Sequence, residues 1–467
     1  MHLPNMKEAK VRGQSKVNYI YEDRSYNKKF TGKKYYIRTY GCQMNVHDSE
    51  EVKAILENLG FEESKVMKDA DFILLNTCAI RENAHDKVFG FLGRCKHLKK
   101  EKKYLIIGLC GCMAQEESVI NEIRSKHPYI DIVFGTHNMN ELPKMLDNVN
   151  KQDIEVYSKE GDVFEFGNLY KRDSKICAWV NIQYGCDKFC TYCIVPYTRG
   201  KQRSRKSEDI LKEVKELKDE GYQEITLLGQ NVNAYGKDLD GEIEFSKLLE
   251  KVSDIGIPRI RFVTSHPWDF TDEMIDIIAS RDNIMPYIHL PLQSGSSRIL
   301  KLMGRRYTKE EYLTLYKKIR EKVKGASITT DIIVAFPGET EEDFQDTLDV
   351  VDECKYDGAF TFIFSPRENT PAALMTDDLS IEEKENRLHT LNEKINMYSR
   401  ESNERMVGTI QKVLVTGVSE KDSKKVCGYT ENMKLVNIKA DKDTIGKIID
   451  VKIEEAKSFS LDGIMVK

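Results

Sequence analysis

A loop of three closely spaced cysteines constrains this chain more than any other feature. Cys186, Cys190 and Cys193 follow a C-x3-C-x2-C pattern, and the aromatic residue Tyr192 precedes the last of them. Three thiolates on one short loop can ligate three irons of a [4Fe-4S] cluster and leave the fourth iron open. Buried reduced cysteines or zinc are the alternatives, but zinc usually takes a fourth Cys or His, and none follows close by in sequence. The spacing favours an iron–sulfur cluster with an exchangeable iron.

Composition places limits on the rest of the chain. Its 467 residues suffice for two to four domains, and a net charge of −4 means that any nucleic acid must meet a local basic patch. The first residues lack the apolar segment of a signal peptide, and the longest apolar run, 104–114, is too short for a bilayer. Eleven cysteines then indicate a reducing compartment and metal ligation. We expect a cytoplasmic protein without membrane contact.

The N-terminal part shows two kinds of pattern. Residues 1–32 carry seven Lys or Arg against three Asp or Glu without apolar periodicity, which predicts a mobile basic arm. From 33 to 150, strand and helix patterns alternate, with strands expected at 35–40, 72–75, 104–109 and 132–134. This alternation predicts a doubly wound parallel sheet, in which ligands gather at the carboxyl ends of the strands.

Three further cysteines recur at those strand ends. Cys42, Cys78 and Cys112 each follow a predicted strand, at intervals of 36 and 34 residues. Parallel strands would bring all three to one edge of the sheet, which predicts a second three-cysteine cluster site. Three unrelated core cysteines are the alternative. Cys110 competes with Cys112, but Gly111-Cys112-Met113 resembles Gly41-Cys42-Gln43, so we favour Cys112.

A charged linker at 151–173 precedes a second series of strands. These are expected at 178–183, 225–228, 259–264, 287–290, 329–335 and 360–364, with helices between them. Thr308 and Glu311 form a capping box that opens one of the helices. Six such units predict an open (β/α)6 partial barrel over 174–402, with its active site at the carboxyl ends of the strands.

Polar and basic side chains follow those strands. The candidate ligand contacts are Tyr192, Gln230, Asn231, Ser265, His289, Gln293 and Glu339. Each could equally be an ordinary loop residue, and His289 a hydrogen-bonded barrel histidine. A basic run beside the cysteine loop contributes Arg199, Lys201, Arg203 and Arg205. Such runs are usually solvated, but at the mouth of a site this one could contact RNA phosphates.

The C-terminal part reads as a separate small module. A long helix is expected over 381–405, and residues 405–467 carry twelve Lys or Arg against nine Asp or Glu. Short strands at 412–416, 435–438 and 448–453 alternate with turns, which predicts a small β-barrel similar to OB-like nucleic-acid modules.

Taken in order, these features resemble the radical S-adenosylmethionine (SAM) methylthiotransferases over nearly the whole chain after the arm. Beside the six cysteines, the matching stretches are Tyr184–Arg205, Gly229–Tyr235, Ser265–Pro267, His289–Ser296 and Phe364–Arg367. Ala335 and Asn369 stand where the family pattern leads us to expect glycine. The resemblance implies a methylthiotransferase domain at 33–150, a radical SAM core at 174–402 and a TRAM domain at 405–467.

The same resemblance implies cofactors and a reaction. Two [4Fe-4S] clusters and SAM are expected; in that superfamily SAM binds the open iron and is cleaved to a 5′-deoxyadenosyl radical. The closest branch modifies C2 of N6-isopentenyladenosine, immediately 3′ of the tRNA anticodon, to the 2-methylthio form. The seven candidate contacts above would then meet SAM or substrate. An electron donor such as flavodoxin or ferredoxin, a sulfur source and a monomeric protein are also expected.

Two other functions are compatible with the sequence. Methylthiotransferases of threonylcarbamoyladenosine in tRNA, or of a ribosomal protein, share the six cysteines, so the cysteines do not distinguish them. A non-catalytic RNA-binding protein with zinc-bound cysteines belongs to a different class. Iron and acid-labile sulfide content would separate that protein from an enzyme with two clusters.

Overall fold

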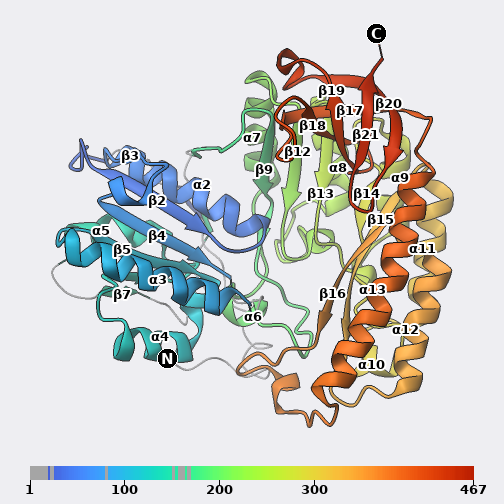
Figure 1. The fold of residues 1–467 in the computed structure, drawn as a ribbon, viewed down its shortest axis with the longest axis horizontal. Coiled ribbons are helices and arrows are strands. Elements are labelled where there is room, and N and C mark those ends of the chain that lie inside the picture. The colour runs from blue at the N-terminus through green and yellow to red at the C-terminus, as the bar shows by residue number, and fades with distance from the viewer. Residues whose placement is uncertain are drawn as a thin grey trace.

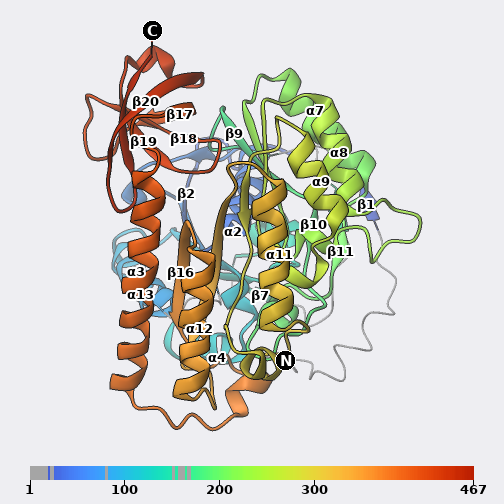
Figure 2. The same ribbon diagram turned by 90° about the vertical axis from the view of Figure 1, so that its right-hand side faces the viewer.

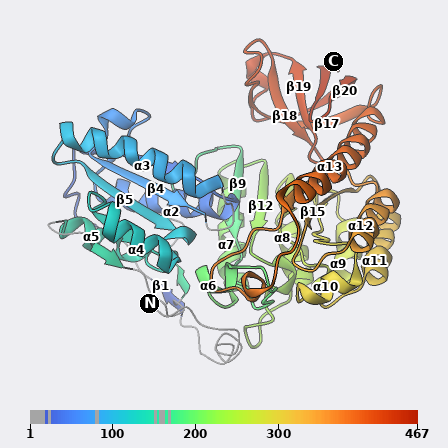
Figure 3. The same ribbon diagram turned by 60° about the horizontal axis from the view of Figure 1, so that its bottom comes forward.

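The computed structural model describes residues 19–21, 26–78, 83–149, 153–155, 163–165 and 170–466. Figure 1 shows three bodies: an N-terminal α/β domain, a central barrel of strands with helices outside it, and a small C-terminal β-barrel. In Figure 3 the C-terminal barrel lies at the end of the long helix α13 (Ile381–Glu404), away from the N-terminal domain. No helix in these ranges is long and apolar enough to cross a membrane.

The N-terminal domain is built on six parallel strands in the spatial order β3, β2, β4, β5, β6, β7. Their bounds are β2 Lys34–Thr39, β3 Glu62–Glu63, β4 Phe72–Thr77, β5 Ile106–Gly111, β6 Ile132–Phe134 and β7 Asp153–Glu155. Helices α2 (Gln43–Asn58) and α5 (Leu142–Asp147) pack on one face, and α3 (Asn83–Glu101) and α4 (Glu117–Lys126) on the other. The predicted doubly wound parallel sheet is confirmed.

The parts predicted as arm and linker are not featureless where the structure describes them. Tyr19–Tyr21 form β1, which pairs in parallel with β8 (Val163–Glu165), and β7 extends the N-terminal sheet past residue 150. The Tyr19 hydroxyl donates to the Ser204 carbonyl oxygen at 2.5 Å, so this piece of the arm is fixed to the central body. The other arm residues up to 25 lie outside the described ranges.

The central body contains six parallel strands that pair in chain order. They are β9 Cys177–Asn181, β12 Glu224–Leu228, β13 Arg259–Phe262, β14 Tyr287–His289, β15 Ser327–Val334 and β16 Gly358–Ile363. Two three-stranded sheets meet where the Ile260 backbone bonds to residues 283 and 285, just before β14. Among these strands β9 and β16 form the two free edges. The predicted open partial barrel is confirmed.

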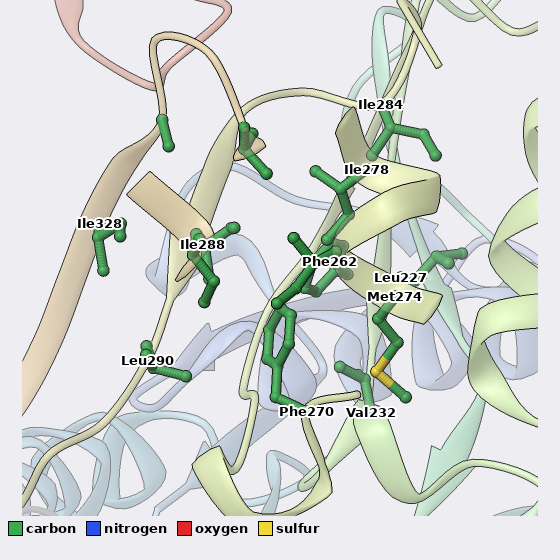
Figure 4. Packing of buried hydrophobic residues seen from close by; sticks show 14 of the residues in the cluster. Leu227, Val232, Phe262, Phe270, Met274, Ile278, Ile284, Ile288, Leu290 and Ile328 are labelled. Atoms are coloured by element: carbon green, nitrogen blue, oxygen red, sulfur yellow. The ribbon is translucent and has the colours of Figure 1, made fainter. Parts of the chain in front are cut away.

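Helices cover the outside of this barrel. Those that stand side by side in Figure 2 are α7 Ser207–Asp219, α8 Phe245–Ile255, α9 Asp272–Ser280, α11 Lys309–Lys322, α12 Glu341–Cys354 and α13. Alternate strand residues pack beneath them: Figure 4 shows Phe262 and Ile288 from two strands close to Met274 and Ile278 of α9. The capping box predicted at Thr308 opens α11 as expected.

The C-terminal module is a closed barrel of five strands in the order β17-β18-β19-β21-β20. The bounds are β17 Ile410–Val418, β18 Val426–Thr430, β19 Leu435–Lys439, β20 Ile448–Ala456 and β21 Leu461–Met465. The small β-barrel is confirmed, although the sequence patterns indicated only three of its strands.

This module packs on the amino ends of the central strands. Arg259, at the start of β13, donates to the Tyr429 and Lys412 carbonyl oxygens at 2.8 and 2.9 Å. Lys434 Nζ donates to the carbonyl oxygen of Asp357, just before β16, at 3.0 Å. The carboxyl ends of the strands, which carry the cysteine loop, are at the opposite pole.

Candidate active site

The cysteine loop leaves the barrel through a position that only glycine can occupy. After β9 the chain forms β10 (Gln183–Tyr184), and Gly185 then adopts a φ of 69°. A Cβ at Gly185 would overlap the Lys201 carbonyl oxygen, so a larger residue would push the two segments apart. The Cys186 amide donates to the Gly200 carbonyl oxygen at 3.2 Å, which fixes the first cysteine against the returning chain.

The middle of the loop is held by Thr191. Its amide and hydroxyl donate to the carbonyl oxygens of Met303 and Leu302, both at 2.9 Å. Its own carbonyl oxygen accepts from the Ala372 amide at 2.9 Å, so two remote segments fix one loop residue. The loop therefore has a single shape before any ligand binds.

The three thiols of this loop lie close enough to influence one another. Burial raises the pKa of Cys193 to about 12, and the neighbouring Cys190 charge adds to that shift. Arg305 opposes it: its Nη1 lies 3.7 Å from Cys190 Sγ and donates a hydrogen bond to it. A buried arginine facing thiolates matches a negatively charged cluster site.

The other three cysteines meet at the carboxyl edge of the N-terminal sheet. Cys42 caps the start of α2, Cys78 follows β4, and Cys112 follows β5. Strand register places residues 39, 76 and 110 side by side, so the chain segments that carry the cysteines leave the sheet together. Burial raises the pKa of Cys112 to about 12, and the charges of Cys78 and Cys42 add to this shift. The three thiols thus form one group.

Two buried asparagines hold this edge together. Asn45, on the first turn of α2, donates to Asn76 Oδ1 at 2.9 Å and to the Thr77 carbonyl oxygen at 3.1 Å. Asn76 in turn donates to the Asn45 carbonyl oxygen at 2.8 Å. These bonds connect the segment that carries Cys42 to the strand that ends at Cys78.

The geometry favours Cys112 over Cys110 as the third ligand. Cys110 lies within β5 and packs in the core under α2 and α5. Cys112 follows Gly111, whose φ is 95° and whose added Cβ would overlap the Thr77 carbonyl oxygen. That turn directs Cys112 out of the sheet, where it packs against Ile194 and Tyr197.

A short helix joins the two cysteine groups. Helix α6 (Val195–Thr198) begins two residues after Cys193, and its residue Tyr197 packs on Cys112 of the N-terminal domain. Arg199 then forms a buried ion pair with Asp48 of α2 at 2.6 Å. Because Cys42 and Cys112 contribute to the raised pKa of Arg199, the guanidinium stands beside the second cysteine group. The two groups are therefore adjacent across one domain interface.

Buried polar atoms without a partner gather at the carboxyl ends of the first barrel strands. They belong to Asn181, Gln183, Gln230, Asn231 and Ser265 in the described chain. Backbone bonding between Val232 and Thr264 holds the last three near one another. Buried amides and hydroxyls normally have partners, so these atoms fit a polar ligand such as SAM, which carries amino, carboxylate and hydroxyl groups.

The other predicted contacts divide into two sets. Tyr192 is half-buried, and its ring lies 6.5 Å from that of Phe336, next to the cysteine loop. His289 lies deeper in the barrel, while Gln293 has a φ of 72° and its amide donates to the Asp331 carbonyl oxygen. Glu339 is engaged elsewhere: it accepts from Arg387 at 3.1 Å and from the Phe336 amide at 3.0 Å, and burial raises its pKa to about 7.

The basic run does not form an exposed surface. Its four members are buried, namely Arg199, Lys201, Arg203 and Arg205. Besides the Arg199–Asp48 pair, Arg205 binds Glu213 at 2.7 Å, and Arg203 Nη1 lies 3.2 Å from His137 Nδ1. The interpretation as an RNA-gripping patch is corrected, because partners remote in sequence neutralise or bind these side chains inside the molecule.

Several residues of the site had no signal in the sequence. Asn181 and Gln183 lie on an ordinary strand pattern, and only their unpaired amides single them out. Arg305 lies 115 residues from Cys190 and belongs to a run of charged residues. A polar pair ending the strand before a cysteine loop would be a usable signal.

The cysteine groups suit clusters better than single ions. In the described ranges, no three His, Cys, Asp or Glu side chains gather closely enough to hold one metal ion. A [4Fe-4S] cluster binds each cysteine on a different iron, so its ligands stand further apart. Three cysteines on each side, each set beside a buried arginine, fit that chemistry.

Comparison with known proteins agrees with this geometry. Three family models match in succession: "Uncharacterized protein family UPF0004" over 34–135, "Radical SAM superfamily" over 180–351 and "TRAM domain" over 404–466. Two solved structures of the radical SAM methyltransferase TsrM from Kitasatospora setae share the fold, with TM-scores of 0.53 and 0.52. They are 14% and 13% identical; 74% and 73% of this chain matches 74% and 75% of theirs.

Curated relatives match over almost the full chain. The tRNA-2-methylthio-N(6)-dimethylallyladenosine synthase of Staphylococcus epidermidis is 52% identical, and the match covers 99% of this chain and 91% of the relative. The protein of the same name from Staphylococcus aureus has the same identity and coverage. The chain belongs to the family of the tRNA-2-methylthio-N(6)-dimethylallyladenosine synthases, as its resemblance to the radical SAM methylthiotransferases predicted.

Proposed function

We propose that this protein adds a methylthio group to C2 of N6-(dimethylallyl)adenosine immediately 3′ of the tRNA anticodon. The names of the curated relatives contain this nucleoside, and the matched TRAM domain agrees with an RNA substrate. The observation that supports the proposal most is the meeting of two three-cysteine groups at one domain interface. Such a pairing suits a reaction that needs both a radical and a sulfur atom.

Membership in the radical SAM superfamily implies SAM and one [4Fe-4S] cluster, which together supply a carbon radical for an unactivated C–H bond. Within this chain, Cys186, Cys190 and Cys193 would ligate that cluster. Thr191 holds their loop in shape, and Arg305 supplies a positive charge beside Cys190. The unpaired amides near them would orient SAM, with Gln230, Asn231 and Ser265 the contacts that the sequence predicted.

We infer that Cys42, Cys78 and Cys112 ligate a second [4Fe-4S] cluster, which would supply the sulfur, while another SAM supplies the methyl group. Asn45 and Asn76 fix the spacing of this group, and α6 sets its distance from the first. The work then divides by domain: sulfur at 33–150, radical formation at 174–402 and RNA contact at 405–467.

Other parts of the proposal concern partners. A one-electron donor such as flavodoxin or ferredoxin and a separate source of sulfur are required, because the chain offers no group that replaces them in the proposed reaction. We infer that the protein acts as a monomer and meets its tRNA in the cytoplasm.

The test is anaerobic turnover of the reconstituted protein with SAM, a reductant and an anticodon stem-loop RNA that carries isopentenyladenosine. We expect 5′-deoxyadenosine by chromatography and the 2-methylthio nucleoside by mass spectrometry, about eight irons per chain, and neither product from Cys186→Ala. Product from an RNA with threonylcarbamoyladenosine, and none from the isopentenylated RNA, would overturn the proposal, as would zinc without sulfide in the purified protein.

A further inference from the structure

The inward face of strands β14 to β16 is open, whereas their outward face is buried. Ile328 and Ile332 of β15 pack beneath the helices, but Thr329, Asp331 and Ile333, which alternate with them, are only half-buried. Successive strand residues point to opposite faces, so these three face the inside of the barrel. Closed barrels fill their interior with packed side chains, so an inward face left open is available to a ligand.

Two phenylalanines stand out on this face. Ala359 and Ile363 of β16 pack against the helix-covered core, and Thr361 contacts Asn392 of α13. Phe360 and Phe362 therefore point inward, yet they are 58% and 45% exposed. Leaving two adjacent aromatic rings in water is unfavourable by about 25 cal/mol for each Å² of apolar surface. An apolar ligand group would remove that cost.

The two rings continue toward the cysteine loop. Phe364, the next inward position after Phe362, is buried, and its ring lies 5.1 Å from that of Phe336. Phe336 in turn contacts Tyr192, the aromatic residue of the cysteine loop. Inward positions repeat about every 7 Å along a strand. Phe362 and Phe360 therefore lie about one and two such steps from the end of the stripe that meets the loop.

Polar groups lie beside the rings at the deeper end. His289 Nδ1 is 3.0 Å from Thr329 Oγ1, and His289 Nε2 is 3.3 Å from Asp331. The Phe360 ring meets that of His289 edge to face at 6.1 Å. One inward face thus offers aromatic surface together with hydrogen-bonding groups.

We propose that Phe360 and Phe362 bind the branched dimethylallyl group on N6 of the target adenosine and so select the isopentenylated nucleoside. This inference rests on the proposed function and assigns the part of the substrate that distinguishes it from ordinary adenosine. The group is small, branched and apolar, and the adenine that carries it is polar at its edge, which matches rings beside His289 and Asp331. C2 and N6 are separated by N1 on the adenine ring, so a C2 facing the loop sends the N6 substituent in another direction, along the wall of β16.

The test compares two anticodon stem-loop RNAs that differ only in carrying N6-(dimethylallyl)adenosine or adenosine at the target position. The Kd of each is measured with full-length reconstituted protein and SAM, without reductant. We expect the wild type to prefer the isopentenylated RNA. Phe360→Ala and Phe362→Ala should each lower this preference about tenfold, the size expected when an apolar group of the ligand no longer packs against its specificity pocket. Phe362→Leu should retain most of it.

Controls separate this effect from general damage. Tyr104→Ala also removes an exposed aromatic ring, in the N-terminal domain, and should leave the preference unchanged. SAM cleavage to 5′-deoxyadenosine should persist in both alanine variants, since their rings do not touch the cysteines. An unchanged preference in the Phe360→Ala/Phe362→Ala double variant would overturn the inference. So would a markedly lower unfolding temperature in the alanine variants, because the rings would then cover part of this chain instead of a ligand.

The outcomes also distinguish this inference from the proposed function. If the wild type makes no 2-methylthio product yet prefers the isopentenylated RNA through these two rings, the reaction is wrong and the binding site stands. If it makes the product while the variants keep the preference, the reaction stands and this site is wrong.

Discussion

Two left-handed backbone positions show what single residues contribute. Ala335, just after β15, has a φ of 56°, and Asn369 has a φ of 66°. Both stand where the family pattern leads us to expect glycine, and the backbone still adopts the conformation that glycine would favour. In this region the Cβ of an L-residue crowds the following carbonyl oxygen at a cost of about 1–2 kcal/mol, which Asn tolerates better than Ala. The strain is therefore larger at Ala335.

Replacing Ala335 by Gly should stabilise the protein by about 1 kcal/mol or slightly less, because relief of strain exceeds the entropy that glycine loses on folding. Asn369→Gly should change the free energy of unfolding by less. Denaturant unfolding of the two variants beside the wild type measures both values. A loss of stability in Ala335→Gly would mean that its methyl group packs better than its backbone conformation suggests.

Which residues could be predicted depends on how local their signal is. The six cysteines and the capping box at Thr308 follow from spacing along the chain, and the structure gathers the cysteines into two groups. Arg199 and Arg205 were interpreted as a surface, because their partners Asp48 and Glu213 come from segments whose proximity no local pattern reveals. Burial of a charge is decided by the fold, and the sequence shows only the charge.

The same distinction holds for strands and helices. The βα rhythm located the central strands because each has a run of apolar residues between helices of regular period. Strands β18 and β21 were missed, since each is five residues long and alternates buried with half-exposed positions between turns. Strand β7 was missed because the segment around it is polar and charged.

Helix α6 and the residue after it form the element that couples the two cysteine groups. Arg199→Gln should leave the Asp48 carboxylate buried without its cation, at a cost of about 3–5 kcal/mol in the free energy of unfolding. The double variant Arg199→Gln/Asp48→Asn should recover much of that loss, because two neutral amides need no countercharge. Denaturant unfolding of the three variants gives the coupling energy. Equal stability of the single and double variants would mean that the pair contributes nothing to docking.

The two groups should also separate by function. Cys42→Ala should keep the barrel cluster and still cleave SAM, but place no sulfur on the adenine, because Cys42 belongs to the other domain. Cys110→Ala is the matched control: its thiol packs in the core, so the variant should retain a three-cysteine site and much activity. Both products, 5′-deoxyadenosine and the 2-methylthio nucleoside, are measured in one reaction. Loss of both in Cys42→Ala, with the barrel cluster intact by spectroscopy, would contradict this division.

Across the three bodies, the C-terminal barrel and the cysteine loops lie at opposite ends of the central strands. An RNA held by that barrel must therefore extend along the central body to reach the loops. The barrel is also part of the core: Arg259 and Arg261 are buried and donate to four of its carbonyl oxygens, those of Lys412, Tyr429, Thr430 and Glu431. Removing residues 405–467 would leave both guanidinium groups without these acceptors, so truncation should destabilise the central strands as well as weaken RNA binding.

Charge substitution tests RNA binding without that damage. Lys421, Lys424, Lys439 and Lys442 are exposed on the C-terminal barrel and lie outside its core. Replacing all four by Ala should leave the unfolding temperature near that of the wild type. It should weaken binding of the anticodon stem-loop and flatten its salt dependence, by about 0.7–0.9 in the slope of log K against log[salt] for each phosphate that is no longer neutralised. The measurement is a salt titration of RNA affinity for the quadruple variant and the wild type. An unchanged affinity and slope would assign the RNA contacts to other surfaces, and the C-terminal barrel would then serve only to close the amino end of the central body.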